Sequence, residues 1–258
     1  VGEKNAIVTA RIYDLASAGT KEVNIPDREK SADGRLDDYL PRMAWTPRKQ
    51  LCLTWMNRHQ NHQKLLLADP ATGNCSVLLE ENNKYYIDLH EVIFLSDGSG
   101  FVVQSEKSGF NHLYKYDMNG KEVAALTSGN WEVTDFYGLD EKNGLAYFQG
   151  ARENALQREI YSVKLNGKGQ KKISGEEGTH SAQFSSTFDY FVSTFSTLNA
   201  PPKYAVYDRK GKLVRALEQN KALEVKQLEY GAAPVEFFKV PLKYEATDKA
   251  GNKTTCRI

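Results

Sequence analysis

Cysteine is scarce in this sequence, because only Cys52, Cys75 and Cys256 occur among its 258 residues. No two of them form a C-x-x-C pair, and their spacing does not match that of a zinc site. A Cys52–Cys75 disulfide is conceivable, but the two residues are predicted on strands separated by a third strand of the same sheet, usually too far apart for the bond. We therefore expect buried or unreactive thiols.

Long hydrophobic runs and an excess of one charge are also missing. No run approaches the roughly 18 apolar residues that a membrane-spanning helix requires, and residues 1–14 lack the basic and then apolar layout of a signal peptide. The start of the sequence thus gives no indication of export. Lys and Arg number 34 against 33 Asp and Glu, with no basic block. This balance predicts a mixed, solvated surface and argues against nucleic acid as a partner.

What the sequence does contain is an internal repeat. A polar turn between two apolar runs recurs along the chain, as DLASAG (14–19), DPATG (69–73), DMNG (117–120), LNGKG (165–169) and DRKG (208–211). The last four begin at residues 69, 117, 165 and 208, so the steps are 48, 48 and 43 residues. A period of roughly 40 to 50 residues with four strand-length runs per unit is typical of β-propeller blades, whereas helical repeats would show a period of 3.6 residues.

The stretch from Phe101 to Phe136 shows the strand pattern most clearly. Its three runs rich in Val, Tyr, Phe and Thr are separated by Ser-Gly and Asn-Gly turn signals, which predicts an antiparallel meander. One blade is expected to end here and the next to begin after the turn at Gly129. The alternation then places Trp131, Val133 and Asp135 on one face of the new strand and Glu132, Thr134 and Phe136 on the other.

These patterns predict an all-β fold, a partial β-propeller of about four four-stranded antiparallel blades plus a half blade. Residues 1–39 are assigned to the end of a preceding blade and a charged surface loop, and residues 40–218 to the four blades, the last three at roughly 89–129, 132–174 and 178–218. Residues 219–235 form a linker with a short helix or turn, because Ala222, Leu223, Val225 and Leu228 have near-helical spacing. Residues 236–258 predict a strand pair around a turn at 248–252.

Four segments carry a more specific resemblance. They are TWMNRHQN (54–61), SEKSGFNHLYKYD (105–117), LTSGNWEVTDFYG (126–138) and LEQNKAL (217–223). In their order and approximate spacing they resemble landmarks of the eight-bladed propeller domain of the dipeptidyl peptidase IV family, within the prolyl oligopeptidase clan of serine peptidases. The resemblance runs from Val1 to about Val240 and corresponds to the second half of that propeller. It implies that residues 236–258 begin a hydrolase domain, with a terminal hairpin as the alternative.

The resemblance also implies a chemistry that this chain does not carry by itself. Members of the family release N-terminal dipeptides, usually after Pro or Ala, with a Ser, an Asp and a His of the hydrolase domain. A nucleophile elbow requires G-x-S-x-G, and the sequence contains no such string. The nearest string, Asp97-Gly98-Ser99-Gly100, has the wrong spacing and is predicted to be a β-turn. We therefore assign no catalytic residue.

No substrate, cofactor or metal site is assigned either. The family holds the substrate's ammonium group with a pair of glutamates, but Glu80-Glu81 and Glu176-Glu177 are predicted to follow outermost strands, where they are expected to be solvated charges that discourage edge pairing. His59 and His62 are expected to contact water at a hairpin tip, because no third ligand is evident nearby. Substrate-binding residues remain unassigned.

Two further sets of residues have plain structural interpretations. Asn74-Cys75-Ser76 and Asn252-Lys253-Thr254 fit the glycosylation pattern, which is short enough to occur by chance. Trp45, Trp55 and Trp131 are expected to wedge between blades, with Trp131 covering a seam.

The functional expectation is a noncatalytic propeller portion of a dipeptidyl aminopeptidase, gating access to a hydrolase domain of the same parent protein. Its implied partners are that domain and peptide substrates, with a homodimer as a further possibility, and the implied location is periplasmic or extracellular. The alternative is a free-standing propeller that binds peptides or partner proteins.

Overall fold

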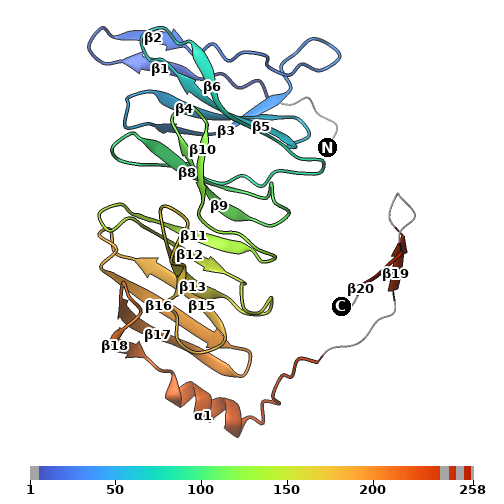
Figure 1. Cartoon of the computed structure of the whole chain (residues 1–258), viewed down its shortest axis with the longest axis vertical. Helices are drawn as coiled ribbons and strands as arrows, with labels where there is room; N and C mark the ends of the chain where they lie inside the picture. The colour runs from blue at the N-terminus through green and yellow to red at the C-terminus, as the bar shows by residue number, and fades with distance from the viewer. Residues whose placement is uncertain (1–5, 239–243, 248–252, 257–258) are drawn as a thin grey trace.

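The computed structural model describes residues 6–238, 244–247 and 253–256. Within these residues the chain forms four four-stranded sheets, two two-stranded sheets and one helix (Figure 1). Every strand pair named below is antiparallel. The fold is all-β and is a partial β-propeller, as predicted.

Each four-stranded sheet is one blade whose strands are neighbours in sequence order. The first blade comprises β3 (Asp38–Trp45), β4 (Leu51–Asn57), β5 (His62–Ala68) and β6 (Cys75–Asn82). The second comprises β7 (Ile93–Phe94), β8 (Gly100–Ser105), β9 (His112–Asp117) and β10 (Glu122–Ala125). The third comprises β11 (Val133–Asp140), β12 (Leu145–Gly150), β13 (Glu159–Lys164) and β14 (Lys171–Lys172). The fourth comprises β15 (Thr179–Phe184), β16 (Tyr190–Thr197), β17 (Ala200–Asp208) and β18 (Leu213–Glu218).

A two-stranded sheet precedes the blades. It pairs β1 (Arg11–Asp14) with β2 (Gly19–Glu22) and is the predicted half blade. The charged loop at 26–37 then leads to β3 and is anchored at its start, because Arg28 Nε donates to Asp38 Oδ2 at 2.9 Å. Trp55 Nε1 donates to the same oxygen at 2.6 Å, and Asp38 is 2% exposed. A buried carboxylate is tolerated when it is paired and hydrogen-bonded in this way.

The recurring turn glycines explain the sequence repeat physically. Gly73, Gly120, Gly167 and Gly211 each close the outer hairpin of one blade with φ between +76° and +85°. A Cβ on any of them would overlap a backbone carbonyl oxygen of the preceding sheet, at Glu22, Leu78, Ala125 and Ile173 respectively. Only glycine satisfies both the left-handed conformation and the close approach. The repeated glycines thus mark the positions at which each blade contacts the preceding sheet.

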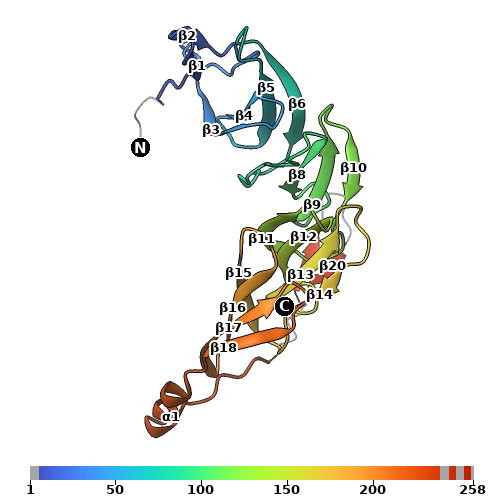
Figure 2. The ribbon, with the colours of Figure 1, turned by 90° about the vertical axis from the view of Figure 1, so that its left-hand side faces the viewer.

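The blades follow one another in an arc (Figure 2). Strands that begin a blade, such as β3 and β11, lie on the concave side, and the outer strands β6, β10 and β14 lie on the convex side. Apolar clusters fill the four seams between neighbouring sheets. Aromatic rings dominate two of them, with Trp131, Phe148 and Tyr161 between the second and third blades and Tyr147, Phe184 and Phe191 between the third and fourth.

Helix α1 (Lys221–Glu229) follows the fourth blade, in the linker where the sequence predicted a short helix or turn. None of its residues is buried. Within the described residues, no helix has the length and hydrophobicity needed to cross a membrane. A final strand pair, β19 (Tyr244–Thr247) with β20 (Lys253–Cys256), agrees with the strand pair predicted near the end of the sequence, whereas the turn predicted at 248–252 lies outside the described residues.

Candidate functional site

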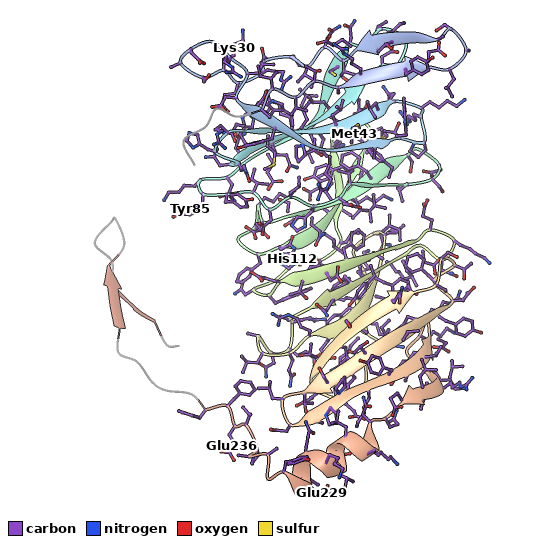
Figure 3. The ribbon with its side chains drawn as sticks, turned by 180° about the vertical axis from the view of Figure 1, so that it is seen from behind. Lys30, Met43, Tyr85, His112, Glu229 and Glu236 are labelled. Carbon is purple, nitrogen blue, oxygen red and sulfur yellow. The ribbon has the colours of Figure 1, made fainter. Side chains whose placement is uncertain are left out.

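The candidate site is a narrow pocket between the first and second blades, beside the connection at 83–92 that joins them. Side chains from β5, β6, the connection at 83–92 and the end of β8 line it. Its polar members are Gln63, Glu81, Asn83, Asp88, His90, Gln104, Ser105 and Glu106. The connection also places Tyr85, which is 76% exposed, at the edge of the molecule (Figure 3).

One hydrogen bond fixes the wall of this pocket. Ser105, at the end of β8, donates from Oγ to Glu81 Oε1 at 2.7 Å, and Ser105 is 4% exposed. The backbone N–H of Lys107 donates in turn to Ser105 Oγ. The Glu81 carboxylate is therefore held between the outer strand of one blade and the second strand of the next.

The pocket carries excess negative charge. Burial raises the pKa of the Glu106 carboxyl, and the carboxylates of Asp88, Glu132 and Glu81 raise it further. Burial also lowers the pKa of His90, although the charge of Asp88 opposes this effect. A neutral histidine among several carboxylates favours cationic groups over anionic ones. The arrangement can attract a positive charge.

Among the described residues, the arrangement most like a catalytic nucleophile and its base is a serine and a histidine of the fourth blade. His180 Nδ1 lies 3.5 Å from Ser193 Oγ, and His180 Nε2 donates to the Glu176 carbonyl oxygen at 2.8 Å. A triad would place a carboxylate at the second nitrogen. Ser193 is moreover only 3% exposed, which keeps a substrate away from its hydroxyl. This pair serves the packing between the third and fourth blades.

The two glutamate pairs lie apart from each other. Glu80 and Glu81 lie within β6, the outermost strand, so their predicted place after that strand is wrong. Glu80 is exposed and Glu81 is half-buried by its bond to Ser105. Glu176 and Glu177 follow β14 as predicted and are exposed, with Glu176 Oε2 3.8 Å from Lys203 Nζ.

His62 differs from its prediction. It begins β5 and is half-buried, with Nε2 2.5 Å from Glu80 Oε1 and its ring edge on Trp55 at a centroid distance of 5.3 Å. A carboxylate is therefore close, which the sequence spacing concealed because the pairing of β5 with β6 makes residues 62 and 80 diagonal neighbours across the two strands. His59 is exposed at the hairpin tip as predicted. No group of three or more metal-ligating side chains gathers anywhere in the described part of the chain.

The remaining motifs keep structural roles. Ser99 N donates to Asp97 Oδ1 at 2.8 Å and Gly98 has φ +69°, which confirms the β-turn. Asn74 is exposed, and its Oδ1 accepts a hydrogen bond from Asn24, whereas Asn252 lies outside the described residues.

Cys52 and Cys75 are free, because they lie on β4 and β6, which β5 separates, and belong to clusters on opposite faces of the first blade. Cys256 falls where side chains are not described.

The three tryptophans divide into two groups. Trp55 is 3% and Trp131 8% exposed, and both fill seams as predicted. Trp45 is 59% exposed, so the prediction of a wedge is wrong for it. It pairs with Leu51 and so shares the face that the half blade packs on, but it lies outside the apolar cluster at that seam, which reaches β3 only at Leu40.

Sequence reasoning missed the acidic pocket itself. Asp88, His90 and Glu106 belong to loops, so no strand alternation marked them. The available signal was the length of the connection at 83–92, which is longer than any turn inside the four blades. Long loops held by a rigid scaffold frequently carry function.

Comparisons with known proteins converge on one family. Residues 1–202 match the family described as "Dipeptidyl peptidase IV (DPP IV) N-terminal region". The dipeptidyl peptidase 4 of Arthroderma otae is 28% identical over 253 residues, which cover 94% of this chain and 32% of that protein. A probable dipeptidyl peptidase 4 of Aspergillus flavus is 23% identical over 254 residues, with the same coverage.

Solved structures show the same relation. The crystal structure of Porphyromonas gingivalis dipeptidyl peptidase 4 has a TM-score of 0.79 and 32% identity, and the match covers 98% of this chain and 34% of that one. A putative dipeptidyl aminopeptidase IV from Bacteroides ovatus has a TM-score of 0.67 and 26% identity, with 80% and 32% covered. The chain thus spans about a third of the length of the relatives it matches. It belongs to the dipeptidyl peptidase IV N-terminal region family.

Proposed function

We propose that this chain is the noncatalytic β-propeller portion of a dipeptidyl aminopeptidase, a serine exopeptidase that releases N-terminal X-Pro or X-Ala dipeptides. In this proposal the blades limit which substrates reach a hydrolase domain whose catalytic residues are encoded outside residues 1–258. The observation that carries it is the match of 94% of the chain to about a third of a dipeptidyl peptidase 4.

The geometry supports a role in substrate access. The concave side of an arc of blades can form one wall of a tunnel, and a tunnel admits extended peptides more readily than folded proteins. The acidic pocket lies beside the connection at 83–92 between the first two blades, and its negative field favours the positively charged N-terminus of a peptide. Both features would guide a peptide without cleaving it.

A contact of the linker supports the proposed division of the chain into blades at 40–218, a linker at 219–235 and, at 236–258, the start of a truncated hydrolase domain or a terminal hairpin. The Asn199 side chain, between β16 and β17, donates from Nδ2 to the Val235 carbonyl oxygen at 2.9 Å and accepts from Val235 N at 2.7 Å. This paired contact holds the end of the linker against the fourth blade, and so fixes the direction in which the chain leaves it.

The isolated chain is expected to have no peptidase activity. The reasons are the missing G-x-S-x-G elbow and the burial of Ser193 beside His180. Hydrolysis of Gly-Pro-p-nitroanilide by purified chain should equal that of buffer, while a cooperative thermal transition of the same sample shows that it is folded. Turnover that survives repurification and is blocked by a serine-directed inhibitor would contradict the assignment.

A further inference from the structure

A second groove opens between the first and second blades, on the concave side. It arises from a mismatch in strand length, because β3 has eight residues and β7, the corresponding strand of the next blade, has two. The short strand leaves part of the first blade's face uncovered. Arg42, Ala44, Cys52 and Thr54 form that wall of the groove, and the pairing of Arg42 with Thr54 and Ala44 with Cys52 places these side chains on one face.

The other wall comes from the segment that leads into β7. Val92 and Phe94 are partly buried and pack against the core of the seam, and Glu91 lies at the rim. We call the space between the two walls the seam groove. Its cavity volume is about 110 Å³. Since an apolar cavity of roughly 150 Å³ holds a benzene molecule, the seam groove has room for one aliphatic side chain.

The buried part of the first-blade wall, formed by Cys52 and Thr54, is chemically inert. Cys52 is 3% exposed, and burial raises the pKa of its thiol to about 12. Such a thiol stays protonated, so it is neither a nucleophile nor a metal ligand and behaves as a small apolar group. Thr54 is likewise 3% exposed. The groove therefore offers burial and shape, with its charge confined to the rim.

The rim carries two opposite charges that do not neutralise each other. Arg42 is exposed, and its guanidinium donates to the Pro41 carbonyl oxygen at 3.0 Å. Glu91 is exposed as well, and among the described residues neither side chain forms an ion pair. A guanidinium offers only donors and a carboxylate only acceptors. An extended peptide presents the complementary carbonyl oxygens and N–H groups on either side of each side chain.

We propose that the seam groove binds one aliphatic side chain of an extended peptide, while Arg42 and Glu91 hydrogen-bond to the flanking peptide backbone. The site faces the concave side, where the neighbouring Met43 is seen in Figure 3. It would hold a peptide segment by one apolar contact and by backbone groups that every sequence shares. The inference rests on the proposed function only for the choice of a peptide as ligand.

The test is a titration of the ¹⁵N-labelled chain with the blocked tripeptide acetyl-Ala-Leu-Ala-amide, up to about 10 mM, followed by amide correlation spectra. Blocked ends exclude recognition of terminal charges. Shifts are expected at Ala44, Cys52 and Val92, and acetyl-Ala-Gly-Ala-amide should bind roughly tenfold or more weakly because it lacks the apolar side chain. Absence of shifts up to that concentration, or equal binding of the glycine peptide, would overturn the proposal.

Variants locate the site. Ala44→Phe places a ring in the groove and should abolish the shifts, and Arg42→Gln should weaken binding several-fold by removing a charged donor. Arg35→Gln removes the same charge from an exposed loop position and should leave binding unchanged. Shifts that survive Ala44→Phe would place the peptide elsewhere and overturn the proposal. If Ala44→Phe does not fold, the contrast between the two arginine variants decides.

Failure of this inference and failure of the proposed function are distinguishable. Binding is measured on the isolated chain and requires no hydrolysis. Peptide binding by a chain whose complete gene product has no peptidase activity would leave the seam groove intact and remove the exopeptidase assignment. A complete gene product that cleaves dipeptides while the isolated chain shows no shifts would remove only the seam groove.

Discussion

Replacing Trp131 with alanine is expected to lower the free energy of unfolding by about 3–5 kcal/mol. Trp131 is 8% exposed in the seam between the second and third blades. Its ring meets His112 edge-on at a centroid distance of 4.9 Å and stacks on Phe148 at 6.1 Å. The substitution removes both contacts and leaves a cavity that the flanking sheets cannot close, because each is held by its own ladder of hydrogen bonds.

The indole is held at its polar end as well. Trp131 Nε1 donates to the Ser128 carbonyl oxygen at 2.9 Å, and the ring lies so close to Gly150 that a Cβ there would approach it within 2.9 Å. The ring therefore has one position, and loss of the ring cannot be compensated by a neighbour. Trp131→Phe is the conservative variant, and it should retain part of the stability that Trp131→Ala loses.

Glu132→Ala is the matched control one residue along. Glu132 is exposed, and the contact that involves its backbone, the bond from Ala151 N to its carbonyl oxygen, survives the substitution. The expected change is about 0.5 kcal/mol. Chemical denaturation of both variants measures the contrast. Equally small effects would show that Trp131 does not support the seam.

Gly120→Ala is expected to be the second most damaging substitution. Gly120 has φ +76°, a conformation that costs an alanine about 1–2 kcal/mol. The new Cβ would also overlap the Leu78 carbonyl oxygen of the first blade. Because that oxygen belongs to a strand backbone, relief requires the two blades to separate, and overpacking of this kind adds about 1–3 kcal/mol.

Gly144→Ala isolates the conformational part of this effect. Gly144 has φ +66°, but a Cβ there would meet nothing within 4 Å. The free energy of unfolding of Gly144→Ala should therefore fall only by the cost of the backbone strain, about 1–2 kcal/mol. Urea denaturation of the two variants gives the difference directly. Equal losses would mean that the blades are not in contact at Gly120, and that the repeated glycines serve their turns alone.

Much of the fold was predictable from the sequence because the turns of the outer hairpins recur at a regular spacing. The outer hairpins need glycine at a left-handed position against the previous blade, so Gly73, Gly120 and Gly211 mark the period whatever the strands contain. Strand faces were harder to predict. A β-bulge between Val133 and Asp135 shifts the register, so Phe136 packs in the same seam as Trp131 instead of on the opposite face. Nothing in the local alternation signals that extra residue.

The candidate site was less predictable than the fold. The acidic pocket and the seam groove are made of residues from two blades and a loop, and their contacts join positions far apart in sequence. Glu81 illustrates the problem, because its partner Ser105 lies on the second strand of the next blade. Trp45 illustrates a second difficulty. Its burial depends on how far the neighbouring sheet extends, which the sequence of its own strand does not indicate.

The most direct test of the exopeptidase assignment is the hydrolysis of Gly-Pro-p-nitroanilide by the complete product of the gene that encodes this chain. The account predicts turnover that a serine-directed inhibitor abolishes, from a polypeptide in which these blades precede a domain with a G-x-S-x-G elbow. A complete gene product without such a domain, and without activity, would contradict the account and favour a free-standing propeller that binds peptides or partner proteins.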